Sequence, residues 1–134
     1  MPLCGIVCAM HRIFKTRHFH RWMSKTELTD RSLYTAILEM LDGLIDAHLG
    51  GNIVKKRVAI SGRGKSSGAR TIVATKFGDN WFFLYGFEKN VRANITDNEL
   101  DALKEIAIDL LALNDDALTS AVAQGKLLEI YYDH

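Results

Sequence analysis

The clearest pattern of apolar and polar positions lies in residues 30–45, where apolar side chains recur at steps of three and four. The stripe consists of Leu33, Ala36, Ile37, Met40, Leu41, Leu44 and Ile45. This spacing is typical of a helix that buries one face on a sheet. Thr29 or Asp30 can cap its first turn. The pair Gly50–Gly51 is expected to end the element, with His48 near its exposed end.

Three runs rich in β-branched and aromatic residues follow, in residues 53–60, 70–77 and 81–87, and they predict strands. In the first run, alternation places Lys55 and Arg57 on one face of the sheet. Lys56 falls on the opposite, core-facing side, where we expect its ammonium to reach solvent at the edge of the core.

The last of these runs is apolar on both faces. Alternation puts Trp81, Phe83, Tyr85 and Phe87 on one face and Phe82, Leu84 and Gly86 on the other. A strand with two apolar faces is typical of a central position, and we expect the helix at 30–45 to cover one side. Most of these rings belong to the core. Tyr85 and Phe87, nearest the strand end, are the two expected to be open to a ligand.

Weaker patterns complete the order of elements. Residues 11–17 and 126–132 read as strands, and residues 18–25 as a short helix. Thr96 and Glu99 form a capping box that begins another helix, and Asn114 can cap a further short one. The chain is therefore expected to be one α+β domain over residues 11–134, preceded by an N-terminal extension, residues 1–10.

Charge is unevenly distributed along the chain. The net charge is only +1, but residues 52–92 carry nine Lys/Arg against two Asp/Glu, and residues 93–134 carry two against nine. The nine cations are Lys55, Lys56, Arg57, Arg63, Lys65, Arg70, Lys76, Lys89 and Arg92. Such crowding favours a polyanionic ligand, and we expect the acidic C-terminal third to lie behind the basic face.

Two cysteines, Cys4 and Cys8, cannot make a disulfide scaffold, so we expect a reducing cytoplasm. The apolar run at residues 3–10 is too short to span a bilayer, and no membrane partner is predicted. His11 alone would not complete a zinc site, which needs about four ligands. We therefore predict no metal and no cofactor.

The Gly/Ser-rich segment at residues 61–68, SGRGKSSG, lacks the GxxxxGK[ST] pattern and precedes a strand rather than a helix. It is therefore not a P-loop. We interpret it as a hairpin tip whose Arg63 and Lys65 can fold over a bound backbone. Lys55 and Arg57 would then lie about 7 Å apart, similar to adjacent phosphates of one strand.

These motifs together resemble the RelE/ParE toxin superfamily, in particular its RelE/HigB-like branch, over about residues 11–130. The residues that carry the resemblance are Gly50, Gly51, Lys55, Lys56, Arg57, Gly62, Gly64, Lys65, Ser66, Gly68, Arg70, Tyr85, Gly86, Phe87, Lys89, Asn94, Ile95, Glu99 and Leu100. Ser67 departs from the pattern, because the branch usually has a second glycine there. The resemblance implies two N-terminal helices packed on a curved, mainly antiparallel sheet of four to five strands, with C-terminal helices.

The resemblance also implies a function. Members are toxins of type II toxin–antitoxin pairs, and most cleave messenger RNA, often on the ribosome. A protein antitoxin silences them, and in HigB-like pairs it usually carries a helix-turn-helix. For this chain we expect a metal-independent mRNA endoribonuclease in the cytoplasm, with mRNA, the ribosome and a cognate antitoxin as partners.

The side chains fit metal-free cleavage of RNA by its own 2′-hydroxyl. Like charges nearby favour the neutral form of a lysine, so Lys55 or Lys56 is a candidate base. Arg57, Arg63 and Arg70 can stabilise the phosphate, and Lys65, Lys89 or Tyr85 can supply a proton. The predicted catalytic residues are Lys55, Lys56, Arg57, Arg70 and Tyr85, and the predicted nucleic-acid-binding residues are Arg63, Lys65, Phe87, Lys89 and Arg92.

Two other functions stay open at this point. The ParE branch of the same superfamily poisons DNA gyrase, so a gyrase-directed toxin is one alternative. A catalytically silent module that binds nucleic acid or an antitoxin is the other. Translation arrest, DNA damage or the lack of any RNA cleavage would separate the three. None of the five histidines lies inside the motif, which argues against a two-histidine ribonuclease mechanism.

Overall fold

The computed structural model describes residues 12–60, 68–76 and 80–131. The elements within them are β1 (Ile13–Thr16), α2 (Arg17–Met23), α3 (Asp30–Leu41), β2 (Ala47–Gly50), β3 (Ile53–Val58), β4 (Ala69–Thr75), β5 (Trp81–Glu88), α4 (Asp97–Leu111), α5 (Asp115–Ala123) and β6 (Leu127–Ile130). None of these helices is long and apolar enough to cross a membrane.

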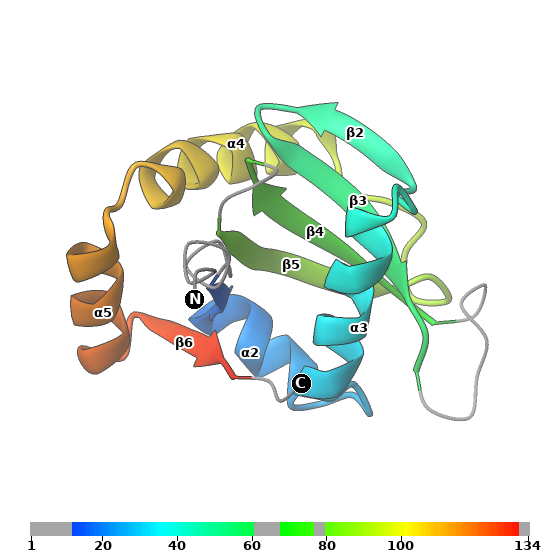
Figure 1. Ribbon diagram of the computed structural model, residues 1–134. Coiled ribbons are helices and arrows are strands. Elements are labelled where there is room, and N and C mark those ends of the chain that lie inside the picture. Colours follow the sequence, from blue (N-terminus) through cyan, green and yellow to red (C-terminus); the bar gives the residue numbers. More distant parts are fainter. Residues whose placement is uncertain (1–11, 61–67, 77–79, 132–134) are drawn as a thin grey trace.

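The strands form one sheet in the order β2-β3-β4-β5-β1-β6 (Figure 1). The β1–β5 pair is parallel, and every other neighbouring pair is antiparallel. The predicted α+β class and mainly antiparallel sheet are confirmed. The sheet has six strands in the part of the chain that the structure describes, where four to five were expected.

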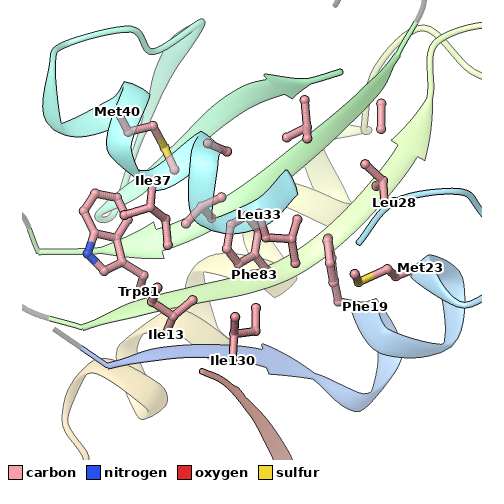
Figure 2. Close-up of a cluster of buried hydrophobic side chains, with 14 of the residues drawn as sticks. Ile13, Phe19, Met23, Leu28, Leu33, Ile37, Met40, Trp81, Phe83 and Ile130 are labelled. Atoms are coloured by element: carbon pink, nitrogen blue, oxygen red, sulfur yellow. The ribbon is translucent and has the colours of Figure 1, made fainter. Parts of the chain in front are cut away.

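Two apolar clusters cover the two faces of the sheet. The first joins α2 and α3 to the sheet through side chains such as Phe19, Leu33 and Phe83 (Figure 2). The second joins α4 and α5 to the sheet through Leu103 and Leu118, among others. Transfer of this apolar surface out of water is what holds the layers together.

The acidic C-terminal third does not lie behind the basic face. Ile53 packs in the same cluster as Leu103 and Ala107 of α4. Alternation along β3 puts Lys55 and Arg57 on the same side as Ile53. The expectation was therefore wrong: α4 borders the basic residues on their own face, because that face is apolar at its Ile53 end.

The helix predicted at 30–45 is shorter than its apolar stripe. It begins after the Thr29 cap and ends at Leu41, and Gly43 then turns with a φ of 91°. Residues 47–50 form β2, so His48 lies on an edge strand rather than at a helix end. Gly50 ends β2, and Gly51 and Asn52 form the turn into β3, with all three residues at positive φ.

A β-bulge changes which rings of β5 share a face. Phe83 pairs with Val73, but Tyr85 pairs with Ile72, so Leu84 is the extra residue. Beyond the bulge Tyr85 and Phe87 turn to the second cluster, whereas Trp81 and Phe83 belong to the first. The predicted grouping of these four rings on one face is wrong, because strict alternation fails at the inserted residue.

The predicted caps are present. The Thr96 side chain accepts a hydrogen bond from the Glu99 amide, while the Glu99 carboxylate accepts one from the Thr96 amide, which completes the capping box of α4. The Asn114 side chain caps α5 by accepting a hydrogen bond from the Ala117 amide, and the Thr29 side chain caps α3 by accepting one from the Ser32 amide. These local interactions fix where each helix begins.

Candidate functional site

Five of the predicted site residues lie in two neighbouring rows that cross the three central strands β3, β4 and β5. One row pairs Arg57 with Arg70, and Arg70 with Phe87. The next row pairs Lys55 with Ile72, and Ile72 with Tyr85. Directly opposed residues of antiparallel strands have Cα atoms about 4.5–5.5 Å apart, and alternate positions share a face. The fold thus gathers Lys55, Arg57, Arg70, Tyr85 and Phe87 on one face of the sheet.

The bulge at Leu84 is what makes this grouping possible. Without the extra residue, Tyr85 would continue the alternation of Trp81 and Phe83 and face α3. With it, the phenol joins the face that carries the cations. Tyr85 is only half-buried there, whereas the residues before it in β5 are buried.

A hollow of about 420 Å³ opens beside the cations of these rows. Asp46, Lys55, Arg57 and Arg70 contribute to its lining. The Arg57 side chain is 47% exposed, and its Nε lies 3.0 Å from Asp46 Oδ2. Asp46 binds Arg57 at its Nε, so the Nη groups of Arg57 stay available for an anion. Lys55 is half-buried and Arg70 is 8% exposed, and both contribute to the lining of the hollow.

Tyr85 is held at its hydroxyl by Arg92. Arg92 Nη1 donates to Tyr85 Oη at 2.9 Å, and the guanidinium lies 6.0 Å from the Tyr85 ring centroid and 5.9 Å from that of Phe87. Two hydrogen bonds join Arg92 to the Glu99 carboxylate, at 2.6 and 3.0 Å. Arg92 was predicted to bind nucleic acid, but the structure places its charge against an acid of α4.

The Arg92–Glu99 pair shifts the acidity of both partners. The Arg92 hydrogen bond, followed by the one from the Thr96 amide, lowers the pKa of Glu99 to about 2. In return, the hydrogen bond to Glu99 raises the pKa of Arg92 above its ordinary value. Both groups therefore stay charged at any physiological pH.

Lys56 lies on the opposite face of the sheet from Lys55 and Arg57. It is 3% exposed, and its Nζ lies 2.9 Å from Glu39 Oε1 on α3. The expectation that Lys56 reaches solvent is wrong, because the partly exposed carboxylate of Glu39 on α3 meets the buried ammonium and balances its charge. The structure does not bring Lys56 together with the other predicted catalytic residues.

The remaining predicted residues divide into three cases. Phe87 is 3% exposed beneath Arg92, so its ring is not open for a base to stack on. Lys89 is exposed directly after β5. Arg63 and Lys65 lie outside the residues that the structure describes, as does the extension at residues 1–10.

Three residues near the site were not singled out as functional from the sequence. The His18 ring stacks on Tyr85, with centroids 5.3 Å apart and an interplanar angle of 10°. Asp46 pairs with Arg57, and Glu99 with Arg92. Glu99 had two sequence signals, as a capping residue and as one of the residues that carry the family resemblance, but neither gave it a role in the site. His18 had none, because its place beside Tyr85 depends on the parallel pairing of β1 with β5.

A second hollow, of about 340 Å³, lies on the far side of Tyr85. His18, Leu84, Leu103 and Ile106 contribute to its mainly apolar lining. Among the described residues, no cluster of three His, Cys, Asp or Glu could hold a metal ion.

A model of one protein family matches residues 11–130 of the chain. Its description is RelE toxin of RelE / RelB toxin-antitoxin system. A comparison with curated proteins gave no match. The match spans every element from β1 to β6 and therefore includes both rows of the candidate site.

Proposed function

This chain belongs to the RelE toxin family of toxin–antitoxin systems, and from that premise we propose that it is a metal-independent endoribonuclease that cleaves messenger RNA on the ribosome. In this proposal it inhibits translation in the cytoplasm, as the toxin of a type II pair. A cognate antitoxin with a helix-turn-helix, as in HigB-like pairs, keeps it silent.

The observation that supports the proposal is that Lys55, Arg57, Arg70 and Tyr85 share one face of the sheet. Three cations and one phenol lie in adjacent rows. The cations line a hollow large enough for a nucleotide phosphate, and the phenol lines the second hollow. This is the set of groups that in-line transesterification of RNA needs: a base, a charge-stabilising pair and an acid.

The reaction divides among these groups as follows. Lys55, in its neutral form, takes the proton from the ribose 2′-hydroxyl, and that oxygen attacks the adjacent phosphorus. Arg57 and Arg70 bind the non-bridging oxygens, on which negative charge increases in the transition state. The bond from phosphorus to the 5′-oxygen breaks, and Tyr85 gives its proton to that oxygen. The products are a 2′,3′-cyclic phosphate and a free 5′-hydroxyl.

Lys56 takes no part in this scheme, because its ammonium is held by Glu39 on the other face. Phe87 contributes as the buried support beneath Arg92 rather than as a stacking surface. Lys89 is exposed beyond the end of β5, and we assign it to the RNA backbone that leaves the site.

Purified protein incubated with programmed ribosomes and messenger RNA tests the proposal. We expect cuts in the RNA, found by mapping new 5′ ends, whose downstream fragments begin with a free 5′-hydroxyl. Arg57→Ala should remove them, while Lys126→Ala, which deletes an exposed cation between α5 and β6, should not. Downstream fragments that begin with a 5′-phosphate would contradict attack by the ribose 2′-hydroxyl.

Expression in cells separates the proposal from its two alternatives. Endoribonuclease activity predicts rapid arrest of protein synthesis without a DNA-damage response. A DNA-damage response with intact messenger RNA would indicate a gyrase-directed toxin. RNA binding with no cuts, even on ribosomes, would indicate a silent binding module.

A further inference from the structure

The guanidinium of Arg92 donates four hydrogen bonds. Its Nε donates to the Asn94 carbonyl at 3.0 Å, and its Nη1 donates to Tyr85 Oη at 2.9 Å. The two Nη groups also meet both oxygens of Glu99. A carboxylate bound in this forked way occupies the edge of the guanidinium that would otherwise grip a phosphate. Arg92 is therefore poorly placed to bind the RNA backbone itself.

Glu99 is fixed from the other direction as well. Its Oε1 accepts from the Thr96 amide at 2.7 Å, which is the return bond of the capping box. The carboxylate thus joins the first turn of α4 to Arg92, and through Arg92 to the hydroxyl of Tyr85. A residue that begins a helix also sets the position of a side chain in the candidate site.

We propose that Glu99 and Arg92 form a clamp that positions Tyr85 as the proton donor of the reaction, and this inference rests on the endoribonuclease function proposed above. Arg92 carries only donors, so the Tyr85 oxygen accepts from it, and the phenol's own O–H must point elsewhere. When Tyr85 gives up its proton, the oxygen gains negative charge in front of an N–H that is already in place. Such donors need no reorganisation during the reaction.

His18 restricts the same ring from its side. It stacks on Tyr85 at 5.3 Å, so the ring is held by His18 while its oxygen is held by Arg92. In this view Glu99 is a positioning residue that acts through Arg92 and touches no substrate.

The test compares Glu99→Gln, Arg92→Lys and Thr96→Ala in the ribosome cleavage assay. Glu99→Gln removes the negative charge that Arg92 binds. Arg92→Lys removes the paired Nη hydrogen bonds and leaves Glu99 intact. Thr96→Ala is the matched control, because it deletes the cap bond to the Glu99 amide and leaves the carboxylate on Arg92. We expect the first two to lower kcat about tenfold or more with KM within about twofold. Thr96→Ala should lower the thermal midpoint but keep kcat within about twofold.

A readout that does not depend on cleavage accompanies these rates. With tyrosine ring carbons labelled, and Tyr85 assigned by Tyr85→Phe, the Tyr85 NMR signals should shift in Glu99→Gln and Arg92→Lys but not in Thr96→Ala. The salt dependence of RNA affinity should be unchanged in Arg92→Gln and shallower in Arg57→Ala, since only a phosphate contact releases counterions.

Three results would overturn the clamp. The first is wild-type kcat in both Glu99→Gln and Arg92→Lys. The second is an equal loss of kcat in Thr96→Ala, which would assign the effect to helix capping. The third is a shallower salt dependence in Arg92→Gln, which would make Arg92 a phosphate ligand. If the wild-type protein makes no cuts, the proposed function fails; if it cuts and the variants match it, only the clamp fails.

Discussion

Lys56 Nζ and Glu39 Oε1 lie 2.9 Å apart and join β3 to α3. The lysine is 3% exposed, so the carboxylate takes the place of water beside its ammonium. Lys15, also buried, pairs in the same way with Asp30 at the first turn of α3, at 2.8 Å. Two lysines of the sheet thus hold the two ends of one helix.

The first prediction concerns this buried pair. Glu39→Ala leaves an ammonium in the core without the carboxylate that now balances it. We expect a loss of about 3 kcal/mol in the free energy of unfolding, measured by urea denaturation, which is the low end for a broken buried pair because Glu39 remains partly exposed. The double variant Glu39→Ala with Lys56→Met should recover most of the loss. Equal instability of the two would show that the pair contributes little.

The second prediction concerns acid stability. In the folded protein Arg92 holds the pKa of Glu99 at about 2, against an ordinary 4.5. A carboxyl whose pKa is lowered by folding stabilises the fold above its unfolded value and loses that effect as pH falls toward the folded value. The thermal midpoint of the wild type should therefore drop faster between pH 5 and about 2 than that of Glu99→Gln. Parallel curves would contradict a folded-state Arg92–Glu99 bond.

A third prediction follows from Arg12, which links β6 and α5 to the start of β1. Its guanidinium donates to both oxygens of Glu129, at 2.9 and 2.6 Å, and to Asp115 at 2.8 Å. Arg12→Ala should cost about 1.5–3 kcal/mol, as expected for hydrogen bonds between charged groups. Hydrogen exchange should then speed up most in β6. Arg31→Ala, at an exposed position in the first turn of α3, is the control and should leave β6 protection unchanged.

The fourth prediction uses the close contact between Gly86 and Trp22. A Cβ at position 86 would fall inside the contact distance of the Trp22 ring. Gly86→Ala should destabilise the protein by about 1–3 kcal/mol, as overpacking usually does, and push α2 away from β5. Adding Trp22→Leu should restore part of the stability in a thermal melt. No recovery would mean that the backbone of β5, rather than Trp22, rejects the methyl group.

The fifth prediction separates phosphate binding from stability. If Lys55 and Arg57 each neutralise one phosphate of single-stranded RNA, replacing either with Gln should reduce the slope of log affinity against log salt by about 0.7. The double variant should lose about twice as much. Lys25→Gln, at an exposed site after α2, is the control and should leave the slope unchanged.

Local signals in the sequence predicted much of the fold. The Thr96–Glu99 capping box, the Asn114 cap and the central strands are all formed by neighbours along the chain, so their patterns can be read directly. The placement of Lys55 and Arg57 on the same face of the sheet was predicted in the same way, because β3 is regular from Ile53 to Val58.

The features that the sequence did not predict depend on contacts between residues far apart along the chain. The bulge at Leu84 shifts the faces of Tyr85 and Phe87, and no residue type in FFLYGF marks the insertion. β2 is an edge strand of only four residues, and this is too short for its alternation to stand out from the helical pattern that precedes it. The burial of Lys56 was missed because its partner, the Glu39 carboxylate, lies on another element. His18 meets Tyr85 only through the parallel pairing of β1 with β5.

The pairing of β1 with β6 has a consequence for how the protein matures. Arg12 and Glu129 are 117 positions apart, yet they meet in adjacent strands, so the sheet can be completed only after nearly all of these residues have been synthesised. Contacts of such high order slow folding. A partly translated chain therefore leaves β1 as an open edge of the sheet until the last described strand has emerged from the ribosome.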